Sequence, residues 1–543
     1  MVGAANPLAA DAGYEMLRAG GSAVDAAIAV QMVLTLVEPQ SSGIGGGAFL
    51  MHFDGATVKA FDGRETAPAS ATESLFQGAG GSTLPYYEGL VGGRSVGAPG
   101  VLRMLALAHS QYGKLPWASL FTPAIKLAEQ GFVVSPRLAA LIGNDRYLKS
   151  DPVAAAYFFD RDGKPWPAGH VLKNPELAGV LREIAVGGAD VFYRGQIARD
   201  IEAKVKNHAS NPGLLSAADI GAYQAKMREP VCSDYKSWTV CGMPPPSSGG
   251  IAIAQMLSML ESRDIRPYAP VNGALNATAV HVFSEAGRLA YADRNRYVAD
   301  PDFVPLPGNS VKPLLDKKYL AERAALITET AMGVAKAGTP PSLELAWGSG
   351  NAPEFPSTSH ISVVDADGHA ISMTTTIEDA FGSRQMVRGF LLNNQLTDFS
   401  FTALDADGPV ANRVQGGKRP RSSMAPTLVF EKGTTNLVMT LGAPGGHAII
   451  NYVAKVLVGV LDWELNLQQA INLPNFGSRN GPTELEQGRV SNILVEQLRA
   501  RGHTVRLMEH TSGVQGIMRM QSAGGPVWFG GADPRREGVA KGD

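Results

Sequence analysis

A threonine lies where a loop gives way to a strand, about two-thirds of the way along the chain. Residues 347–357 are rich in Gly, Pro and Ser, and the alternating run at 360–364 (HISVV) predicts a β-strand directly afterwards. Thr358 is then either an ordinary strand residue or a new N-terminus, formed by cleavage of the Ser357–Thr358 bond. A Thr with a free α-amino group carries its own general base, which is one way to activate a weak hydroxyl nucleophile.

The turn after this strand predicts what faces Thr358. Its sequence, Asp-Ala-Asp-Gly, suits a type I turn whose Gly takes a positive φ, which closes a three-residue hairpin loop. This loop pairs Asp365 with His369, and counting back places Thr358 opposite Thr376, where two hydroxyls can hydrogen-bond. A two-residue loop would instead place Thr358 opposite Thr375. The competing interpretation is a half-buried hairpin whose Thr residues serve β-propensity alone.

Three downstream segments supply other groups that an acyl-transfer site needs. A strand at 436–441 runs into Gly-Ala-Pro-Gly-Gly and an apolar helical stretch, and such a corner exposes backbone N–H groups that can stabilise an oxyanion. Residues 419–426 (RPRSSMAP) combine paired Ser hydroxyls with Arg, which suits a carboxylate. Residues 389–399 (GFLLNNQLTDF) contain an Asn, a Gln and an Asp that suit an ammonium.

Together these motifs resemble the γ-glutamyltranspeptidase family (glutathione hydrolases), and the resemblance covers nearly the whole chain. It extends from residues 5–47 through FDGRE at 61–65, PPPSSGG at 244–250 and YADR at 291–294 to the Asp-Pro-Arg at 533–535. It implies an α+β fold: the four-layer αββα sandwich of N-terminal-nucleophile hydrolases.

The resemblance also implies that the precursor cleaves itself before Thr358. The products would be a heavy segment, residues 1–357, and a light segment, residues 358–543, which associate as a heterodimer in one αββα fold. The Thr358 hydroxyl would then attack the γ-amide of a donor such as glutathione, with the new α-amine as base. Amino acids, peptides or water would accept the γ-glutamyl group.

The family's functional residues carry over onto matching positions. The implied catalytic residues are Thr358, Thr376 as its hydrogen-bond partner, and Gly445 and Gly446 as oxyanion donors. The implied carboxylate ligands are Arg64, Ser422 and Ser423. The implied ammonium ligands are Gln395 and Asp398. Each has an ordinary alternative, such as a surface ion pair for Arg64, turn positions for the two Ser and Asp398, or a tight corner for the two Gly.

Two departures from the family pattern bear on specificity. Glu378 stands where the family usually has Asn, and the hypothesis is that it lies beside Asp398 and Gln395 and helps bind the ammonium. This placement assumes that Glu378 lies two residues past Thr376 on the same face of an extended strand; the alternative is a solvated carboxylate at a strand end. Residues 399–420 occupy the position of the family's lid but contain no Tyr or Trp, which predicts a more open pocket.

Three functions follow as candidates. The first is a γ-glutamyl hydrolase/transferase, the second a glutaryl- or cephalosporin-type acylase on the same scaffold, and the third an uncleaved relative that only binds. The intact site residues Thr358, Thr376, Gly445, Gly446, Ser422 and Ser423 argue against the third.

Composition excludes several other classes. The net charge is −2 and 18% of the residues are charged, so nothing indicates a nucleic-acid or anionic-membrane partner. The longest apolar run, residues 26–37, is interrupted by Gln31 and predicts a buried helix rather than a membrane span. The ten His show no metal-ligand spacing. The G-x-G-x-x-A match at 43–48 follows a helix and opens a strand, the reverse of a dinucleotide site, so neither a metal nor another cofactor is expected.

The cysteines and the N-terminus bear on localisation. Cys232 and Cys241 flank a predicted turn and can form a local disulfide, which fits an oxidising compartment, or remain two free thiols. The first residues show no signal peptide. Since bacterial members of the family are commonly exported, the expectation is a periplasmic or secreted protein whose signal peptide has been trimmed.

Apolar periodicity and capping residues predict several helices. They are expected at 7–18, from 22, at 100–109, 120–130, 278–297, 447–460 and 467–471.

Overall fold

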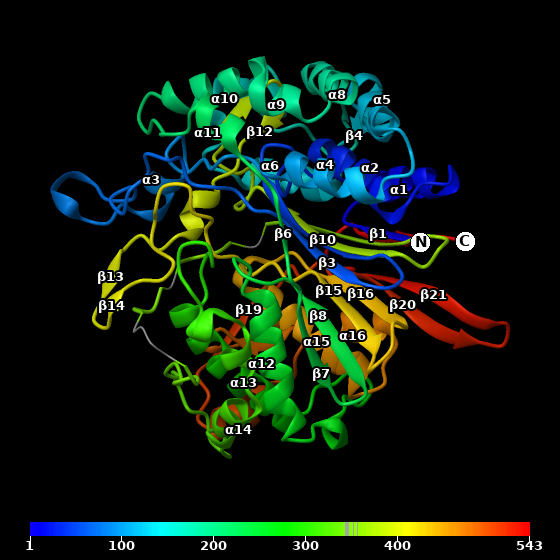
Figure 1. The fold of residues 1–543 in the computed structure, drawn as a ribbon, viewed down its shortest axis with the longest axis vertical. Helices are drawn as coiled ribbons and strands as arrows, with labels where there is room; N and C mark the ends of the chain where they lie inside the picture. The colour runs from blue at the N-terminus through cyan, green and yellow to red at the C-terminus, as the bar shows by residue number, and fades with distance from the viewer. Residues whose placement is uncertain (343–346, 351, 356) are drawn as a thin grey trace.

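Two β-sheets lie face to face between two layers of helices, which confirms the expected αββα architecture (Figure 1). The computed structural model describes residues 1–342, 347–350, 352–355 and 357–543. The N- and C-terminal strands lie side by side at one edge of the first sheet, where Val2 pairs with Lys541.

The first sheet is antiparallel and has seven strands. In spatial order these are β22 (Val539–Lys541), β1 (Val2–Ala4), β9 (Ser359–Val364), β10 (Ala370–Thr376), β2 (Gly47–Phe53), β3 (Val58–Gly63) and β6 (Lys226–Arg228). The second sheet is antiparallel with six strands. These are β21 (Gly525–Ala532), β20 (Gln515–Ser522), β16 (Leu437–Gly442), β15 (Thr427–Glu431), β8 (Trp238–Gly242) and β7 (Val231–Tyr235).

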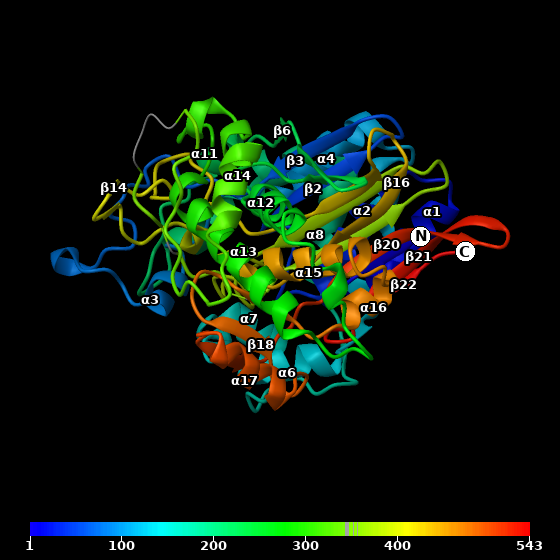
Figure 2. The same ribbon diagram turned by 90° about the horizontal axis from the view of Figure 1, so that it is seen from below.

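Helices cover the outer face of each sheet. The first sheet is covered by α1 (Pro7–Arg18), α2 (Ala23–Val37) and α4 (Val101–Tyr112), with α5 (Thr122–Gln130), α8 (Pro175–Gly187) and α10 (Gln196–Lys206) outside them. The second sheet is covered by α12 (Gly249–Glu261), α13 (Ala277–Tyr297), α15 (Ile449–Leu461) and α16 (Leu467–Asn472), several of which lie in front of it in Figure 2. The predicted helices are therefore present, with ends displaced by at most three residues, the largest shift being that of α4, which continues to Tyr112 instead of ending at 109.

Local signals explain where the first two helices begin. Asn6 accepts a hydrogen bond from the Leu8 N–H, and Pro7 occupies the first helical position, where a missing N–H costs nothing. Ser22 and Asp25 form a capping box at the start of α2. Every residue of α2 is buried, so this helix is apolar all round because it lies within the core. No helix in the described ranges is long and apolar enough to cross a membrane.

The β9–β10 hairpin has the predicted three-residue loop. The Asp365 N–H donates to the His369 carbonyl over 3.0 Å, and Gly368 has a φ of 81°. Thr375 pairs with Ser359, so the next step along the ladder sets Thr376 against Thr358. The alternative register, with Thr358 facing Thr375, is wrong.

Segments from both sides of residue 358 are interleaved in the two sheets. In the first sheet, β9 and β10 lie between β1 and β2; in the second, β15 pairs with β8. Cys232 on β7 faces Cys241 on β8, and the two form a disulfide with an S–S distance of 2.04 Å. The structure thus selects the disulfide over two free thiols.

Candidate active site

The hydroxyl of Thr358 lies at the end of β9 and faces Thr376 at the end of β10. Thr358 Oγ1 donates a hydrogen bond of 3.1 Å to Thr376 Oγ1, which also accepts from the Glu378 N–H over 2.9 Å. Both Thr side chains are buried. Because the acceptor oxygen is itself held by a backbone N–H, the Thr358 hydroxyl is fixed in one orientation.

The backbone around Thr358 is strained and anchored. Thr358 has a φ of 104°, which a β-branched residue rarely adopts and which typically costs about 1–3 kcal/mol. Its carbonyl accepts a hydrogen bond of 2.9 Å from Arg536 Nη1. On the other side of the bond, Ser357 Oγ donates to the Gln40 carbonyl over 2.6 Å. The surroundings therefore hold the backbone next to the Ser357–Thr358 bond in an unfavourable conformation. Pro356 lies outside the described residues.

A glycine corner follows β16, as the sequence predicts. Gly445 has a φ of 134° and Gly446 a φ of 56°, both in the region that favours glycine. A Cβ on Gly446 would lie only 2.5 Å from the Phe355 carbonyl oxygen, so the corner also needs glycine for space. The short helical turn Gly446–Ala448 precedes α15, which is why the helix begins at Ile449 rather than 447.

Eight of the ten predicted site residues line one small cavity. They are Arg64, Thr358, Thr376, Glu378, Gln395, Asp398, Ser422 and Gly446. Glu354, Phe355, Met424 and Ile449 complete the lining. The remaining two, Gly445 and Ser423, directly adjoin Gly446 and Ser422 in the chain. Segments distant in sequence thus meet around the Thr358 hydroxyl.

One wall of this cavity offers hydrogen-bond acceptors. Gln395 Nε2 donates to Asp398 Oδ2 over 2.6 Å, and Arg64 Nη2 lies 2.5 Å from the same oxygen. Asp398 Oδ1 and Gln395 Oε1 are buried and have no hydrogen-bond partner among the described residues. A buried acceptor without a donor is costly, so these two oxygens are suited to a cationic ligand such as an ammonium.

Two carboxyl groups in this wall have raised pKa values. Burial raises the pKa of Asp398 to about 7, and the Arg64 guanidinium opposes that rise. Burial, followed by repulsion from Asp398 and Asp379, raises the pKa of Glu378 well above its usual range. In both groups burial disfavours the charged form, and each carboxyl is the other's unfavourable neighbour.

Arg64 is buried, so it is not the surface ion-pair partner that its sequence context alone would allow. Besides Asp398, its Nε donates to the Pro420 carbonyl over 3.1 Å and its Nη2 to the Arg421 carbonyl over 2.8 Å. These contacts fix the plane of the guanidinium in the cavity wall.

The two Ser hydroxyls each accept a hydrogen bond from the protein. Ser422 Oγ accepts from the Met424 N–H over 3.1 Å, and Ser423 Oγ accepts from Arg294 Nη2 over 2.7 Å. A hydroxyl that accepts from its surroundings keeps its proton for an anionic ligand. This side of the cavity is therefore suited to a carboxylate.

The reason given for placing Glu378 in the site is wrong, although Glu378 does line the cavity. Strand β10 ends at Thr376, and Glu378 has a φ of 81°, so it is not extended. The chain turns back there, and the Glu378 carboxylate accepts from Asn394 Nδ2 and, over 3.3 Å, from the Phe355 N–H. It is buried rather than solvated.

An aromatic side chain from an unexpected segment packs against two residues of the cavity wall, Glu378 and Phe355. Tyr86 begins α3 (Tyr86–Leu90), and its hydroxyl lies 3.5 Å from Glu378 Oε2. Its ring stacks on Phe401 at 5.9 Å and lies 4.9 Å from the ring of Phe355. The prediction of a more open pocket rests on residues 399–420 alone and does not include Tyr86, which packs on Phe401 of that segment.

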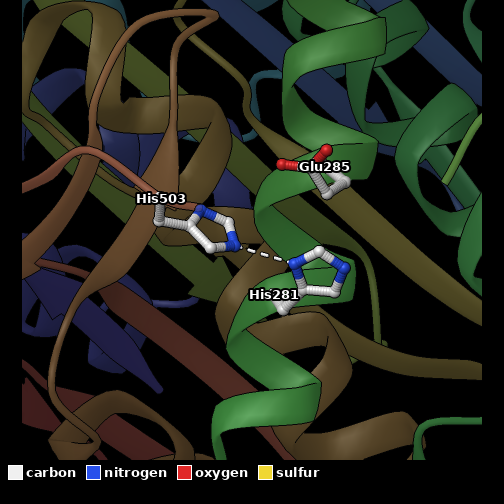
Figure 3. Close-up of side chains that lie close together, drawn as sticks. All are labelled: His281, Glu285 and His503. Atoms are coloured by element: carbon white, nitrogen blue, oxygen red, sulfur yellow. Dashed lines mark hydrogen bonds between the residues drawn. The ribbon is translucent and has the colours of Figure 1, made fainter. Parts of the chain in front are cut away.

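A second polar cluster lies away from this cavity and joins α13 to the C-terminal region (Figure 3). His281 Nε2 donates to the Thr328 carbonyl over 2.8 Å, so its Nδ1 is an acceptor, which His503 Nε2 contacts at 2.7 Å. Glu285 Oε1 accepts from Arg288 Nε over 2.8 Å. These potential metal ligands already satisfy one another or a cation, so the cluster is best explained as structural. His281 and Glu285 are one helical turn apart on α13, but His503 lies 222 positions from His281, too far for a spacing rule to find.

Comparisons with known proteins agree with this geometry. The family model of gamma-glutamyltranspeptidase matches residues 9–543. The chain is 35% identical to the glutathione hydrolase proenzyme of Bacillus subtilis (strain 168), covering 100% of this chain and 91% of that protein. It is 37% identical to that of Escherichia coli (strain K12), covering 98% and 90%. Its structure resembles the cephalosporin acylase from Bacillus halodurans, with a TM-score of 0.85, 28% identity and coverage of 100% and 96%. The chain therefore belongs to the gamma-glutamyltranspeptidase family and is an enzyme of the N-terminal-nucleophile hydrolase class.

Proposed function

We propose that this enzyme cleaves the γ-glutamyl amide of glutathione and related compounds after cutting its own chain before Thr358. The observation that carries the proposal is the Thr358 hydroxyl, held by Thr376 in a cavity that also contains Arg64 and Asp398. One wall suits a carboxylate and another an ammonium, which is the charge pattern of a γ-glutamyl group.

In the maturation step, Thr358 Oγ1 attacks the carbonyl carbon of Ser357 and the peptide C–N bond breaks. The Ser357 acyl group is then esterified to Thr358, whose nitrogen becomes a free amine. Water hydrolyses the ester and leaves a Ser357 carboxylate and an unmodified Thr358 hydroxyl. The strained φ of Thr358 supports this step, because cleavage relieves the strain.

In turnover, the Thr358 amine takes the hydroxyl proton while Oγ1 attacks the donor's γ-carbonyl carbon. The N–H groups of Gly445 and Gly446 stabilise the oxyanion, and the donor's amine leaves with a proton. Water, an amino acid or a peptide then attacks the γ-glutamyl ester and regenerates Thr358. We assign the donor's α-carboxylate to Arg64, Ser422 and Ser423. We assign its α-ammonium to Gln395, Asp398 and Glu378.

The mature enzyme would be a heterodimer of residues 1–357 and 358–543. The interleaved strands support this, since β9 and β10 of the light segment are hydrogen-bonded on both sides by heavy-segment strands. Export to the periplasm or the medium is supported by the Cys232–Cys241 disulfide, because disulfides persist in oxidising compartments.

A glutaryl- or cephalosporin-type acylase is the second candidate, favoured by the structural similarity to a cephalosporin acylase. The unpartnered oxygens of Asp398 and Gln395 favour the γ-glutamyl donor, because a glutaryl group has no ammonium to occupy them. The test is to compare kcat/KM for γ-glutamyl and glutaryl anilides. A preference for the γ-glutamyl anilide supports the proposal. A preference for the glutaryl anilide would instead identify the protein as a glutaryl- or cephalosporin-type acylase.

A further inference from the structure

A buried ion pair links the segment before the cleavage site to the wall of the nucleophile cavity. Arg294 on α13 pairs through Nη2 with Glu354 Oε1, and His447 Nε2 lies 3.1 Å from the same oxygen. None of the three side chains is more than 9% exposed. Burial opposes ionisation of Glu354, but His447 and the Arg294 guanidinium together hold its pKa well below its usual range. Glu354 is thus a carboxylate bound in a site built for one.

The other partners of Arg294 are neutral. Its Nε donates to Ser248 Oγ over 2.8 Å, its Nη1 to Asn295 Oδ1 over 2.9 Å and its Nη2 to Ser423 Oγ. Among the described residues, Glu354 is the only carboxylate within ion-pair distance of this guanidinium. If Glu354 leaves, a buried positive charge remains without a counter-charge, which is strongly unfavourable unless another anion replaces it.

Glu354 belongs to the segment that cleavage before Thr358 sets free. Its carbonyl oxygen and that of Phe355 lie against the oxyanion corner, 2.7 Å and 2.5 Å from where a Cβ on Gly446 would stand. Glu354 and Phe355 also line the nucleophile cavity. In the uncut chain this segment therefore fills space that a donor would need, and its withdrawal would expose Arg294 and His447 to that cavity.

We propose that Arg294, with His447, forms a carboxylate site that Glu354 occupies in the precursor and the donor's α-carboxylate occupies in the mature enzyme. Ser423 ties the two states together, because it is an expected ligand of that carboxylate and is hydrogen-bonded directly to Arg294. This inference rests on the proposed γ-glutamyl function. It makes Arg294 a specificity-determining residue that acts on the carboxylate end of the donor, and Glu354 an internal mimic of that end.

The charge and space beside the site are consistent with this role. A neighbouring cavity of about 320 Å³ is lined by Arg294, His447 and Pro353 together with Arg479 and Arg506. The one carboxylate among its described lining residues, Glu484, is paired with Arg479, so the three Arg outnumber it. Because Pro353 lines this cavity and Glu354 the nucleophile cavity, withdrawal of the segment would enlarge the space around Arg294. The basic lining is suited to a carboxylate and disfavours an ammonium.

The experiment compares three anilide donors that differ only in their charged groups. The γ-glutamyl anilide has a carboxylate and an ammonium, the glutaryl anilide has the carboxylate alone, and the 4-aminobutanoyl anilide has the ammonium alone. The two test proteins are Glu354→Gln and the double variant Arg294→Gln/Glu354→Gln, in which neither charge is left buried alone. Arg296→Gln, which removes a partly exposed Arg from the same helix, is the control.

We expect the double variant, relative to Glu354→Gln, to lose at least about tenfold in kcat/KM for both carboxylate donors, the equivalent of about 1.4 kcal/mol. Its kcat/KM for the 4-aminobutanoyl anilide should stay within about twofold. Gel analysis and active-site titration would normalise each value to the cleaved enzyme. An equal change for all three donors would overturn the inference. If the double variant does not mature, Arg294→Lys/Glu354→Gln, which keeps the positive charge, replaces it. The inference is also overturned if this Lys variant matures but shows no preference for the carboxylate donors over the 4-aminobutanoyl anilide. If the wild type cleaves no γ-glutamyl donor, the proposed function itself is wrong.

Discussion

Thr358 Oγ1 and Thr376 Oγ1 lie 3.1 Å apart on adjacent strands, eighteen residues apart in the chain. The separation follows from the three-residue loop after Asp365, which sets the register of the whole hairpin. Because the Glu378 N–H also donates to Thr376 Oγ1, the position of this acceptor oxygen does not depend on Thr358. The pair thus combines a hydroxyl that can react with a neighbour that orients it.

The first prediction concerns this pair. Thr376→Val keeps the shape of the side chain but removes the acceptor, and loss of a buried hydrogen-bond partner costs roughly 1–3 kcal/mol. Maturation should therefore slow by roughly 5- to 150-fold, measured as the loss of the full-length band on a gel. Thr375→Val is the control, since Thr375 makes only a 3.4 Å contact with the Gly47 carbonyl. Equal rates for the two variants would show that Thr376 does not orient the nucleophile.

The second prediction concerns Arg64. Its guanidinium faces the cavity and holds Asp398, so Arg64→Ala removes a charge-assisted contact that is worth roughly 1.5–3 kcal/mol. In the cleaved enzyme, kcat/KM for a γ-glutamyl anilide should fall by about 10- to 150-fold. Arg413→Ala, which removes an Arg paired with Glu73 outside the cavity, should leave kcat/KM unchanged. A correctly matured Arg64→Ala enzyme with wild-type kcat/KM would remove Arg64 from the site.

The third prediction concerns pH. The pKa of the Asp398 carboxyl is raised to about 7, so the carboxylate that would bind the donor's ammonium is present above pH 7 and lost below it. The ratio of kcat/KM for γ-glutamyl to glutaryl anilide should therefore rise with pH through about 7. Taking the ratio cancels the titration of the Thr358 amine, which both donors share. Asp398→Asn should flatten the profile, and a wild-type ratio independent of pH would count against the ammonium site.

The fourth prediction concerns Glu378. Because burial and repulsion from Asp398 raise the pKa of its carboxyl well above the usual range, Glu378 is protonated at the acidic end of the working range. Glu378→Gln should then have little effect there. As the pH rises through the raised pKa of Glu378, the variant should lose activity relative to the wild type, more for γ-glutamyl than for glutaryl anilides. Equal loss for both donors at every pH would instead assign Glu378 to the support of Thr376.

The sequence predicts those parts of the site that depend on local rules. The Asp-Ala-Asp-Gly turn sets the register that brings Thr358 to Thr376, and the Gly445-Gly446 corner is readable as a strand-to-helix turn. The contacts of Glu354 are not predictable in this way, because Arg294 lies sixty residues earlier and His447 lies beyond the cleavage site. Tertiary packing alone brings these side chains together.

For the same reason, the sequence does not predict the aromatic packing of Tyr86 beside the cavity or the contact between the two His. Tyr86 contacts Phe401 and Glu378 from a short helix that has no motif of its own, so residues 399–420 alone do not predict it beside the cavity. His281 and His503 meet across 222 positions of sequence. Glu378 lines the predicted cavity, but the predicted reason is wrong: a turn, and not an extended strand, directs its side chain there.

Self-cleavage before Thr358 is the central claim, and the N-terminal sequence of the light chain tests it most directly. Purified wild-type protein should separate into two chains on a denaturing gel, and Edman sequencing of the smaller chain should read Thr-Ser-His-Ile from Thr358. Thr358→Ala should remain a single inactive chain of full length. A light chain that begins at any other residue, or an active enzyme that is never cleaved, would contradict the account.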